Sequence, residues 1–599
     1  MQAVILAAGM GSRLGKYTQN STKCMVKVGG HTLLERIFNS LRKAGVSKAV
    51  IVTGYCADKL TEHAIKAAGD DISVTFIYND KYNITNNIYS LYLASEYMMQ
   101  EDSVLFESDL IFDETIVTDI LNDPSPDLVT VSRFENWMDG TVTTFDEFGN
   151  VTSFIDKSNF IWDNCMSYYK TVNIYKLSAD FFKNWYHPFL EAYIKTCGNN
   201  AYYEMVLKVI TNINSSKLKA LDITGKKWYE IDTPQDLQTA ETLFAEENQL
   251  EDLKKRYGGY WRFHNLKDYC YLVNPWFPTQ ELKNEIKHSF SELITQYPSG
   301  QSVIRTAMAS LLECSEDYIS VGNGAAELIK LMGQIISGRY FLTMPSFNEY
   351  VSSFSGAERI TLDTGRQNFS YNADDIINAS KNADTVVIIN PDNPSGNFIQ
   401  KNDMLRLLDI CSARGQKIIV DESFIDFADP EIRYTLINDE ILQKYPSLAV
   451  VKSISKSYGV PGIRLGALCS SDKAFISKIN SLLPIWNINS YGEYFLQVCA
   501  KYRKEYKFSC DEIAAERKRF AKLLTETGKL EVYPSQANFI MCRLKSGSAE
   551  ALAQSLIKDR FFIKDLKSKE GCSAYEMIRL AVKTPEENDL LVSLISEKM

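Results

Sequence analysis

Short apolar runs alternate with amphipathic segments along the first 120 residues. The apolar runs predict buried strands at 3–8, 49–53, 74–78 and 104–106. Helical periodicity predicts helices at 33–44 and 88–98. Repeated strand–helix units are typical of a mainly parallel sheet covered by helices. In such a sheet, ligands bind at the carboxyl ends of the strands.

The first apolar run leads into a glycine-rich loop that carries Gly9, Gly11, Arg13 and Gly15. Glycines let backbone N–H groups approach an anion, and nearby cations neutralise it. Arg13, together with Lys23 and Lys27 further along, is a basic residue available for this purpose. The pattern predicts a phosphate-binding loop.

Acidic residues follow two of the predicted strands. Asp109 comes after the run 104–106, and Glu230 and Asp232 alternate around Ile231, so they share one strand face. Mg²⁺ takes few protein oxygens and keeps room for substrate phosphates. These carboxylates are therefore metal-ligand candidates; the alternative for Asp109 is a loop residue that caps the next turn.

Composition narrows the class of protein. The 599 residues allow about two to four domains. A formal net charge of −10 argues against a nucleic-acid binder or a protein of acidic membranes. The 12 cysteines form no Cys-x-x-Cys pair, which indicates reduced thiols and a cytoplasmic location. We expect no signal peptide, and no apolar stretch reaches the ~18 residues of a membrane span.

Residues 1–245 resemble the sugar-nucleotidyltransferase superfamily through the loop at 6–15 and Lys23. Segments 52–55, 79–90 and 229–232 resemble its CTP:phosphocholine cytidylyltransferase branch. The resemblance implies a mixed sheet with a Rossmann-like half, with Lys23 as a catalytic residue and Mg²⁺ held by Asp109, Glu230 and Asp232. It implies CTP-binding residues at Leu6, Ala8, Gly9, Gly11, Arg13, Lys23, Tyr55 and Asn87. Thr22 stands where the branch usually has proline.

The acceptor of the nucleotide is expected to carry an amine, because this branch holds one with aromatic and acidic residues. The matching positions are Trp137, Tyr203 and Glu204, with Lys157 as the candidate for the phosphorus-bearing end. The alternative is that Trp137 and Tyr203 are core aromatics and that Glu204 is a solvated helix charge.

Residues 246–262, rich in Glu, Lys and Arg, are predicted to join two domains. The region 263–599 carries further motifs at 320–327, 385–396, 417–424 and 453–466. In this order and spacing they resemble the class I/II aminotransferases, in the histidinol-phosphate aminotransferase branch. The resemblance implies an α/β fold of type I with a large and a small domain, pyridoxal 5'-phosphate (PLP) as cofactor, and a homodimer through this region.

The resemblance also assigns roles in that domain. Lys456 bonds covalently to the cofactor and moves the substrate's α-proton. Arg579 clamps a substrate carboxylate. The other cofactor-binding positions are Asp421 at the pyridine nitrogen, Asn393 at the ring hydroxyl, Phe347 stacked on the ring, Ala325, Ala326, Ser453 and Arg464 at the phosphate, and Tyr297 reaching the neighbouring subunit's cofactor. Phe424 replaces a tyrosine that many relatives have, which leaves the reaction outcome open.

Two enzymes on one chain usually serve one pathway. The resemblance implies transamination of phosphonoacetaldehyde to 2-aminoethylphosphonate with an amino-acid donor, followed by transfer of CMP from CTP to that amine. One alternative keeps the cytidylyltransferase but acts on phosphocholine or phosphoethanolamine, with the PLP domain a phospho-amino-acid decarboxylase or a histidinol-phosphate-like aminotransferase. Another alternative makes the PLP domain a degenerate dimerisation and sensing module.

Overall fold

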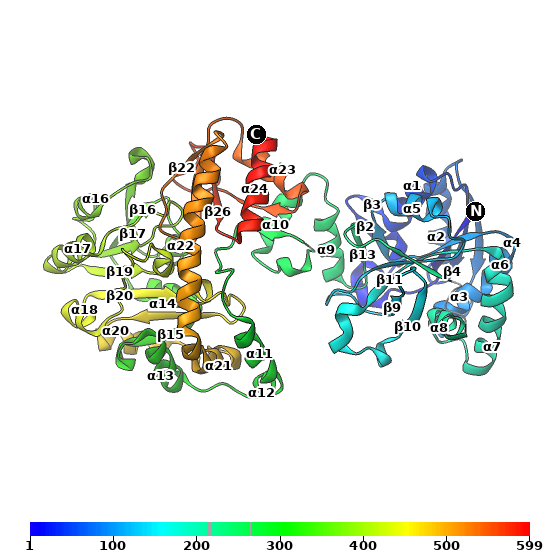
Figure 1. The fold of residues 1–599 in the computed structure, drawn as a ribbon, viewed down its shortest axis with the longest axis horizontal. Coiled ribbons are helices and arrows are strands. Elements are labelled where there is room, and N and C mark those ends of the chain that lie inside the picture. The colour runs from blue at the N-terminus through cyan, green and yellow to red at the C-terminus, as the bar shows by residue number, and fades with distance from the viewer. Residues whose placement is uncertain (214–217, 264) are drawn as a thin grey trace. The chain divides into compact units, whose positions relative to one another are not determined.

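The computed structural model describes residues 1–213, 218–263 and 265–599, and it divides into two compact units, 1–264 and 265–599 (Figure 1). The segment 246–262, expected to be a joint, belongs to the first unit. It forms α10 (Gln249–Arg256) and a short 3₁₀ helix at Tyr260–Arg262. Leu250 and Leu253 of α10 are buried, and α10 contacts α9 (Pro234–Leu243). Apolar burial therefore makes this segment part of the folded unit.

The first unit contains a mixed sheet in the order β10-β9-β11-β6-β1-β4-β5. Its parallel half confirms the predicted strands: β1 (Gln2–Ala7), β4 (Lys48–Thr53), β5 (Ser73–Tyr78) and β6 (Ser103–Glu107). The other half pairs antiparallel around β11, except that β12 joins β8 in parallel. Its strands are β8 (Leu128–Arg133), β9 (Val142–Phe145), β10 (Val151–Ile155), β11 (Tyr169–Leu177) and β12 (Lys219–Asp222).

Alternation along β1 divides the hydrophobic core between the two faces of this sheet. Ala3 and Ile5 pack in one cluster, and Val4 and Leu6 pack in the other. The first cluster takes in α1 (Leu33–Lys43), whose Thr32 N-cap and Glu35 form a capping box. Further helices are α2 (Ala57–Ala68), α3 (Asn87–Leu93), α4 (Ser95–Gln100), α5 (Thr115–Asn122), α7 (His187–Cys197) and α8 (Glu204–Ile213).

A short antiparallel pair beside the main sheet positions the predicted metal ligands. Strand β7 (Leu110–Phe112) pairs with β13 (Trp228–Glu230) so that Glu230 lies opposite Leu110. The Ile231 amide also donates to the carbonyl of Asp109 at 2.9 Å. Segments more than one hundred residues apart therefore bring their carboxylates together.

The second unit contains a large sheet in the order β15-β21-β20-β19-β18-β16-β17. Strands β16 to β20 run parallel and β21 runs antiparallel to β20 and β15. Alternate residues of β18 enter different hydrophobic clusters, so both faces are covered. The strands are β15 (Ile319–Asn323), β16 (Arg339–Met344), β17 (Glu358–Asp363), β18 (Thr385–Ile389), β19 (Lys417–Asp421), β20 (Leu448–Ser453) and β21 (Leu465–Cys469).

A smaller antiparallel sheet lies in the C-terminal part of this unit, in the order β22-β23-β26-β25. Its strands are β22 (Leu530–Val532), β23 (Phe539–Leu544), β25 (Lys564–Asp565) and β26 (Met577–Ala581). The long helix α22 (Arg503–Glu526), orange in Figure 1, contacts β22 and the last helix α24 (Pro585–Lys598).

Further helices of the second unit are α11 (Gln280–His288), α13 (Gln301–Leu312), α14 (Ala325–Ile335), α15 (Asn348–Ser353), α16 (Ala373–Ala379), α17 (Lys401–Ala413), α19 (Ile454–Ser457), α20 (Lys473–Leu482), α21 (Ser490–Cys499) and α23 (Ala549–Lys558). Among the described residues of the whole chain, no helix is long and apolar enough to cross a membrane.

Candidate active sites

A cavity of about 650 Å³ opens at the carboxyl ends of β1 and β6 in the first unit. Most of the predicted nucleotide-binding residues line it: Leu6, Ala8, Gly9, Gly11, Arg13, Lys23 and Asn87. Gly11 has φ +60°, and a Cβ there would lie 2.6 Å from Cγ of Lys23. A glycine is required because the loop turns sharply and passes directly over the lysine stem.

Asp109, Glu230 and Asp232 gather at one side of this cavity, with carboxylate oxygens within 4.8 Å of one another. Lys23 donates from Nζ to Asp109 Oδ2 at 2.8 Å and to Asp232, and Arg13 pairs with Asp232 at 2.8 Å. Oδ1 of Asp109 is buried and has no hydrogen-bond partner among the described residues. Clustered carboxylates with a free oxygen are a donor set that fits Mg²⁺.

Burial and neighbouring charges shift the pKa values of Lys23 and Glu230. Burial lowers the pKa of Lys23, but the Asp109 and Asp232 carboxylates outweigh burial and raise it above the ordinary lysine value. Burial raises the pKa of Glu230 to about 7, with Lys170 opposing and the neighbouring aspartates adding to the rise. A divalent cation would favour the ionised form of every carboxylate here.

Thr22 begins the short helix that presents Lys23. It is the N-cap residue of the 3₁₀ helix Lys23–Met25, it is buried, and its Oγ1 lies 3.0 Å from Sγ of Cys24. The Thr22 carbonyl accepts from the Met25 amide at 3.1 Å. The turn is therefore formed by backbone and side-chain hydrogen bonds, without the proline of the resembling branch.

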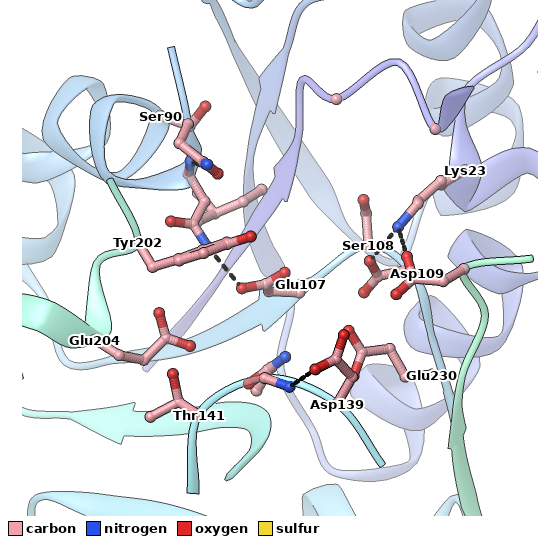
Figure 2. A pocket seen from close by; sticks show the side chains of 18 of the residues that line it. Lys23, Ser90, Glu107, Ser108, Asp109, Asp139, Thr141, Tyr202, Glu204 and Glu230 are labelled. Carbon is pink, nitrogen blue, oxygen red and sulfur yellow. Dashed lines mark hydrogen bonds and ion pairs between the residues drawn. The ribbon is translucent and has the colours of Figure 1, made fainter. Parts of the chain in front are cut away.

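Two further acids line the cavity: Figure 2 shows Glu107 between the Lys23–Asp109 pair and Glu204, with Tyr202 near Glu204. Asn87 connects the elements that carry them: its Nδ2 donates to Glu107 at 2.9 Å, and its Oδ1 accepts from the Tyr203 amide at 3.0 Å. Burial raises the pKa of Glu107 well above the ordinary value, and burial also raises that of Glu204.

Sequence reasoning missed Glu107 and Lys170, which both line the cavity. Glu107 is the last residue of β6, two residues before Asp109. It directly follows the predicted run 104–106, and this position could have identified it. Lys170 lies inside β11, donates to the Thr171 carbonyl at 2.6 Å, and lies 3.7 Å from Glu230. A lysine within a strand carries no local sign of its function, because only the sheet brings it to the cavity.

Two of the predicted acceptor residues are placed elsewhere. Trp137 is not among the described residues that line the cavity; it stacks on Tyr229 at 4.2 Å and donates to Glu135. The ring of Tyr203 is 1% exposed and packs edge-on against Tyr175, so its neighbour Tyr202 lines the cavity instead. For both residues the alternative of a core aromatic is the better description.

Of the other predicted positions in this unit, Lys157 and Glu204 line the cavity and Tyr55 does not. Tyr55 is also absent from the described lining and donates its hydroxyl to the Gln19 carbonyl at 2.6 Å. Lys157 lines the cavity and pairs with Asp139 at 3.1 Å. Glu204 lines it and is buried, which excludes the alternative of a solvated helix charge.

In the second unit, the predicted site forms where neighbouring parallel strands end. Asn393 follows β18, Asp421 ends β19, and Lys456 follows β20 in the short helix α19. Asp421 is buried and accepts from the Tyr350 hydroxyl at 3.0 Å and from the Ser423 amide at 2.9 Å. Tyr350 was not predicted; it belongs to α15, far from Asp421 in sequence.

Lys456 lies between aromatic rings. Its Nζ is 4.9 Å from the ring centre of Phe347 and 4.6 Å from that of Phe424. Burial lowers the pKa of Lys456 to about 8, with Asp421 opposing and Arg579 and Arg464 adding to the fall. A lysine with so low a pKa is partly neutral near physiological pH and can act as a nucleophile or base.

The start of α14 forms an anion cradle. Gly324 precedes it with φ +76°, and a Cβ there would lie 2.6 Å from Nη2 of Arg464. The Arg464 carbonyl accepts from the Gly324 amide at 3.1 Å. The predicted Ala325 and Ala326 are the first residues of this helix, whose free N–H groups favour a phosphate. Predicted Ser453, at the end of β20, is buried.

Arg579 on β26 is oriented by its neighbours. It donates to Asn393 Oδ1 and to the Cys270 carbonyl, each at 2.7 Å. Its Nε is buried and has no hydrogen-bond partner among the described residues, and burial lowers its pKa to about 10. Tyr297 lies at the surface: it is 79% exposed and stacks on Trp486 at 4.5 Å.

Comparisons with known proteins match a different family model in each of the two units. Residues 267–595 match the family model of aminotransferase class I and II, and residues 3–151 match that of the MobA-like NTP transferase domain. The CMP-5'-(3-aminopropyl)phosphonate synthase of Streptomyces rubellomurinus is 29% identical over 100% of this chain and 95% of its own length. The L-serine phosphate decarboxylase of Sulfurospirillum multivorans is 33% identical over 57% of this chain and 90% of its own.

Solved structures resemble the second unit. A decarboxylase from Sulfurospirillum multivorans matches with a TM-score of 0.51 and 31% identity, over 58% of this chain and 91% of its own. The histidinol-phosphate aminotransferase from Clostridium acetobutylicum matches with a TM-score of 0.50 and 28% identity, over 56% of this chain and 100% of its own.

Fold and comparisons define an enzyme in which a nucleotidyltransferase domain is joined to an aminotransferase-like domain, and they confirm the predicted fold class. The chain belongs to the aminotransferase class I and II family.

Proposed function

We propose that the first unit transfers CMP from CTP to a small amine that carries a phosphonate, in a Mg²⁺-dependent reaction. The supporting observation is the arrangement of its cavity: metal-type carboxylates lie beside Lys23, and the acids Glu107 and Glu204 line the same cavity. The name of the relative that matches the whole chain describes a CMP–aminophosphonate product, which supports the same chemistry.

In this proposal a phosphonate oxygen of the acceptor attacks the α-phosphorus of CTP. The bond from that phosphorus to the β-phosphate oxygen breaks, and pyrophosphate leaves with its electron pair. Bound Mg²⁺, held by Asp109, Glu230 and Asp232, would neutralise phosphate charge. Lys23 and Arg13 pair with carboxylates of this cluster, and metal binding there would make both cations available to the triphosphate.

The second unit would use PLP, because its residues fit that cofactor. Lys456 would bond to it, Asp421 would face the pyridine nitrogen, and the start of α14 with Ser453 and Arg464 would hold its phosphate. When bound, PLP supplies an electron sink for the carbon that loses a proton or a carboxylate. Nζ of Lys456 would carry the proton, while Arg579 would orient the carboxylate of the amino donor.

We assign to this unit the formation of the amine, by transamination of phosphonoacetaldehyde to 2-aminoethylphosphonate. The amine made here would be the acceptor of the first unit. The exposed Tyr297 is consistent with a homodimer in which that ring reaches the partner's cofactor. The amino donor would be an amino acid, held by Arg579.

A second candidate reaction for this unit is decarboxylation of a phosphorus-bearing amino acid. Phe424 stands where many aminotransferases have a hydroxyl group, and it lies against Lys456. The relative that is 33% identical is named as an L-serine phosphate decarboxylase. Decarboxylation would also yield a small primary amine, so the role of the first unit would stand.

The test uses the full chain with cofactor, CTP and Mg²⁺. Pyrophosphate release is measured with 2-aminoethylphosphonate, 3-aminopropylphosphonate, phosphoethanolamine and phosphocholine as acceptors. Carbon dioxide and keto-acid release are measured in parallel with phosphonoacetaldehyde plus amino acids, and with phospho- and phosphono-amino acids alone. Release of pyrophosphate with the phosphate esters only would refute the phosphonate assignment. Release of carbon dioxide without keto acid would replace transamination by decarboxylation.

A further inference from the structure

Lys569 is a further cation at the predicted cofactor site of the second unit. It belongs to the segment 566–576, which joins β25 to β26. Its Nζ donates to Oδ1 of Asn348 at 2.9 Å. Asn348 directly follows Phe347, and the ring centre of Phe347 lies 4.9 Å from Nζ of Lys456. Lys569 is therefore hydrogen-bonded to the immediate neighbour of a ring that lies against Lys456.

Close packing and an ion pair hold the segment that carries Lys569 in place. Gly571 has φ +87°, and a Cβ there would lie 2.8 Å from the backbone nitrogen of Pro345. Glu570 pairs with Arg359 of β17 through two hydrogen bonds, at 2.6 and 3.1 Å. The backbone next to Lys569 is thus fixed against two neighbouring elements, which positions its ammonium group before any ligand arrives.

Arg579 and Lys569 both lack a carboxylate partner. Arg579 donates to the amide oxygen of Asn393 and to the Cys270 carbonyl, and the hydrogen bond of Lys569 also goes to a neutral amide. Among the described residues, neither cation has a carboxylate within ion-pair distance. Asp268 acts on Arg579 electrostatically from further away, and burial still lowers the pKa of Arg579 to about 10. An anionic ligand would supply the missing counter-charge.

The two cations also act on each other. Burial lowers the pKa of Lys569 to about 8, and the Arg579 guanidinium adds to that fall. Lys564, which pairs with Arg579 in the register of β25 and β26, adds to it as well. The Asp392 carboxylate opposes the fall, but it accepts its hydrogen bonds from Ser395 rather than from Lys569. The positive charge near Arg579 therefore exceeds what one carboxylate ligand would neutralise.

The proposed transamination requires this site to take two kinds of anion in turn. The carboxylate of an amino donor is planar and singly charged, and the guanidinium of Arg579 can bind both of its oxygens. A doubly ionised phosphonate is tetrahedral and leaves a further oxygen and a further charge outside that pairing. A lysine ammonium is a compact point charge that suits the remaining oxygen.

We infer that Lys569 joins Arg579 in a subsite for the phosphonate group and makes the second unit prefer phosphonate to carboxylate ligands. This assignment rests on the proposed function, because it concerns the substrate of amine formation in that unit. A lysine ammonium has three N–H groups, and Asn348 takes one of them. The others would donate to phosphonate oxygens. Decarboxylation of a phosphorus-bearing amino acid would use the same subsite.

The experiment titrates the full chain, loaded with PLP, with ethylphosphonate and with propanoate. These ligands carry the two anions on the same carbon chain and have no amine or carbonyl that could react. Binding is followed by isothermal titration calorimetry and by the visible absorbance of the bound cofactor, which reports the second unit alone. CTP and Mg²⁺ are left out. We expect ethylphosphonate to bind about 10- to 100-fold more tightly, the ratio that follows from one charged hydrogen bond.

A second arm compares Lys569→Gln and Lys569→Arg with the wild type, with Lys567→Gln as the matched control. Lys567 is an exposed residue of the same segment and pairs with Glu576 at 2.5 Å. Lys569→Gln should weaken ethylphosphonate binding by about 10- to 100-fold and propanoate binding far less. Lys569→Arg retains the charge and should recover part of the preference. Lys567→Gln should match wild type with both ligands.

The outcomes separate the subsite from the proposed reaction. Equal affinities of the wild type for the two ligands would overturn the subsite. Equal losses with both ligands in Lys569→Gln would also overturn it, because Lys569 would then act on folding or through Arg579. A selective loss in Lys569→Gln supports the subsite even if the full chain forms no amine from phosphonoacetaldehyde and amino acids. That absence of amine would refute the proposed transamination alone.

Discussion

Asp109 offers the sharpest test of the nucleotidyltransferase site. Asp109→Asn keeps the side-chain shape but removes one charge from the carboxylate cluster and one of the oxygens that the cluster offers Mg²⁺. Loss of an outer contact to a metal ligand reduces affinity or activity by about 10- to 100-fold. We therefore expect loss of a direct ligand to lower CMP transfer by more than about 100-fold, with part of the loss recovered at high Mg²⁺.

Two opposing effects of the same substitution act on folding. Asp109→Asn weakens a charged hydrogen bond from Lys23 at 2.8 Å, a loss of about 1.5–3 kcal/mol. It also removes repulsion between Asp109 and the carboxylates of Glu230 and Asp232, which offsets part of that loss. We expect the net loss in the free energy of unfolding to stay below the ~3 kcal/mol upper value for that hydrogen bond.

The assay measures pyrophosphate release across a range of Mg²⁺ concentrations, with amine formation by the second unit measured on the same preparation. Amine formation serves as an internal control because it depends on residues of the other unit. Asp58→Asn, at an exposed first-turn position of α2, is the matched control and should match wild type. Near-normal CMP transfer in Asp109→Asn would refute the metal assignment.

The remaining predictions concern the second unit. Lys456→Ala should abolish the visible absorbance of bound cofactor yet leave CMP transfer intact; persistence of a covalent cofactor band would show that another lysine is used. Gly324→Ala should weaken cofactor binding by at least about tenfold in an equilibrium titration, because its Cβ would meet the Arg464 guanidinium at 2.6 Å in a left-handed backbone conformation. Unchanged affinity would contradict the anion cradle. Covalent attachment of the cofactor to apoprotein needs the neutral amine of Lys456, whose pKa is lowered from 10.5 to about 8. The rate should therefore rise with pH and level off above about pH 8; a rise that continues toward pH 10.5 would refute the lowered pKa.

Local patterns sufficed where a function depends on residues near one another in the chain. The loop after β1, the helix start at Ala325 and Asp109 could be located from the sequence, because each follows an apolar run that forms a strand. Asp421, at the end of β19, was assigned through the resemblance to the aminotransferases. Lys170 and Tyr350 could not be located in this way. Their environment arises from pairing of β11 and from packing of α15 beside Asp421.

The first unit shows most clearly which features the sequence determined and which only the tertiary structure decided. The sequence alone determined an α/β fold and a phosphate-type loop, because strand periodicity and loop chemistry are local properties. The set of cofactor-type residues was predicted from the resemblance to the class I/II aminotransferases. Only the tertiary structure decided that Trp137 and Tyr203 pack away from the cavity and that Tyr202 and Glu107 line it. The choice between adjacent residues depends on which side of a packed element faces the core. Contacts between distant segments decide that orientation.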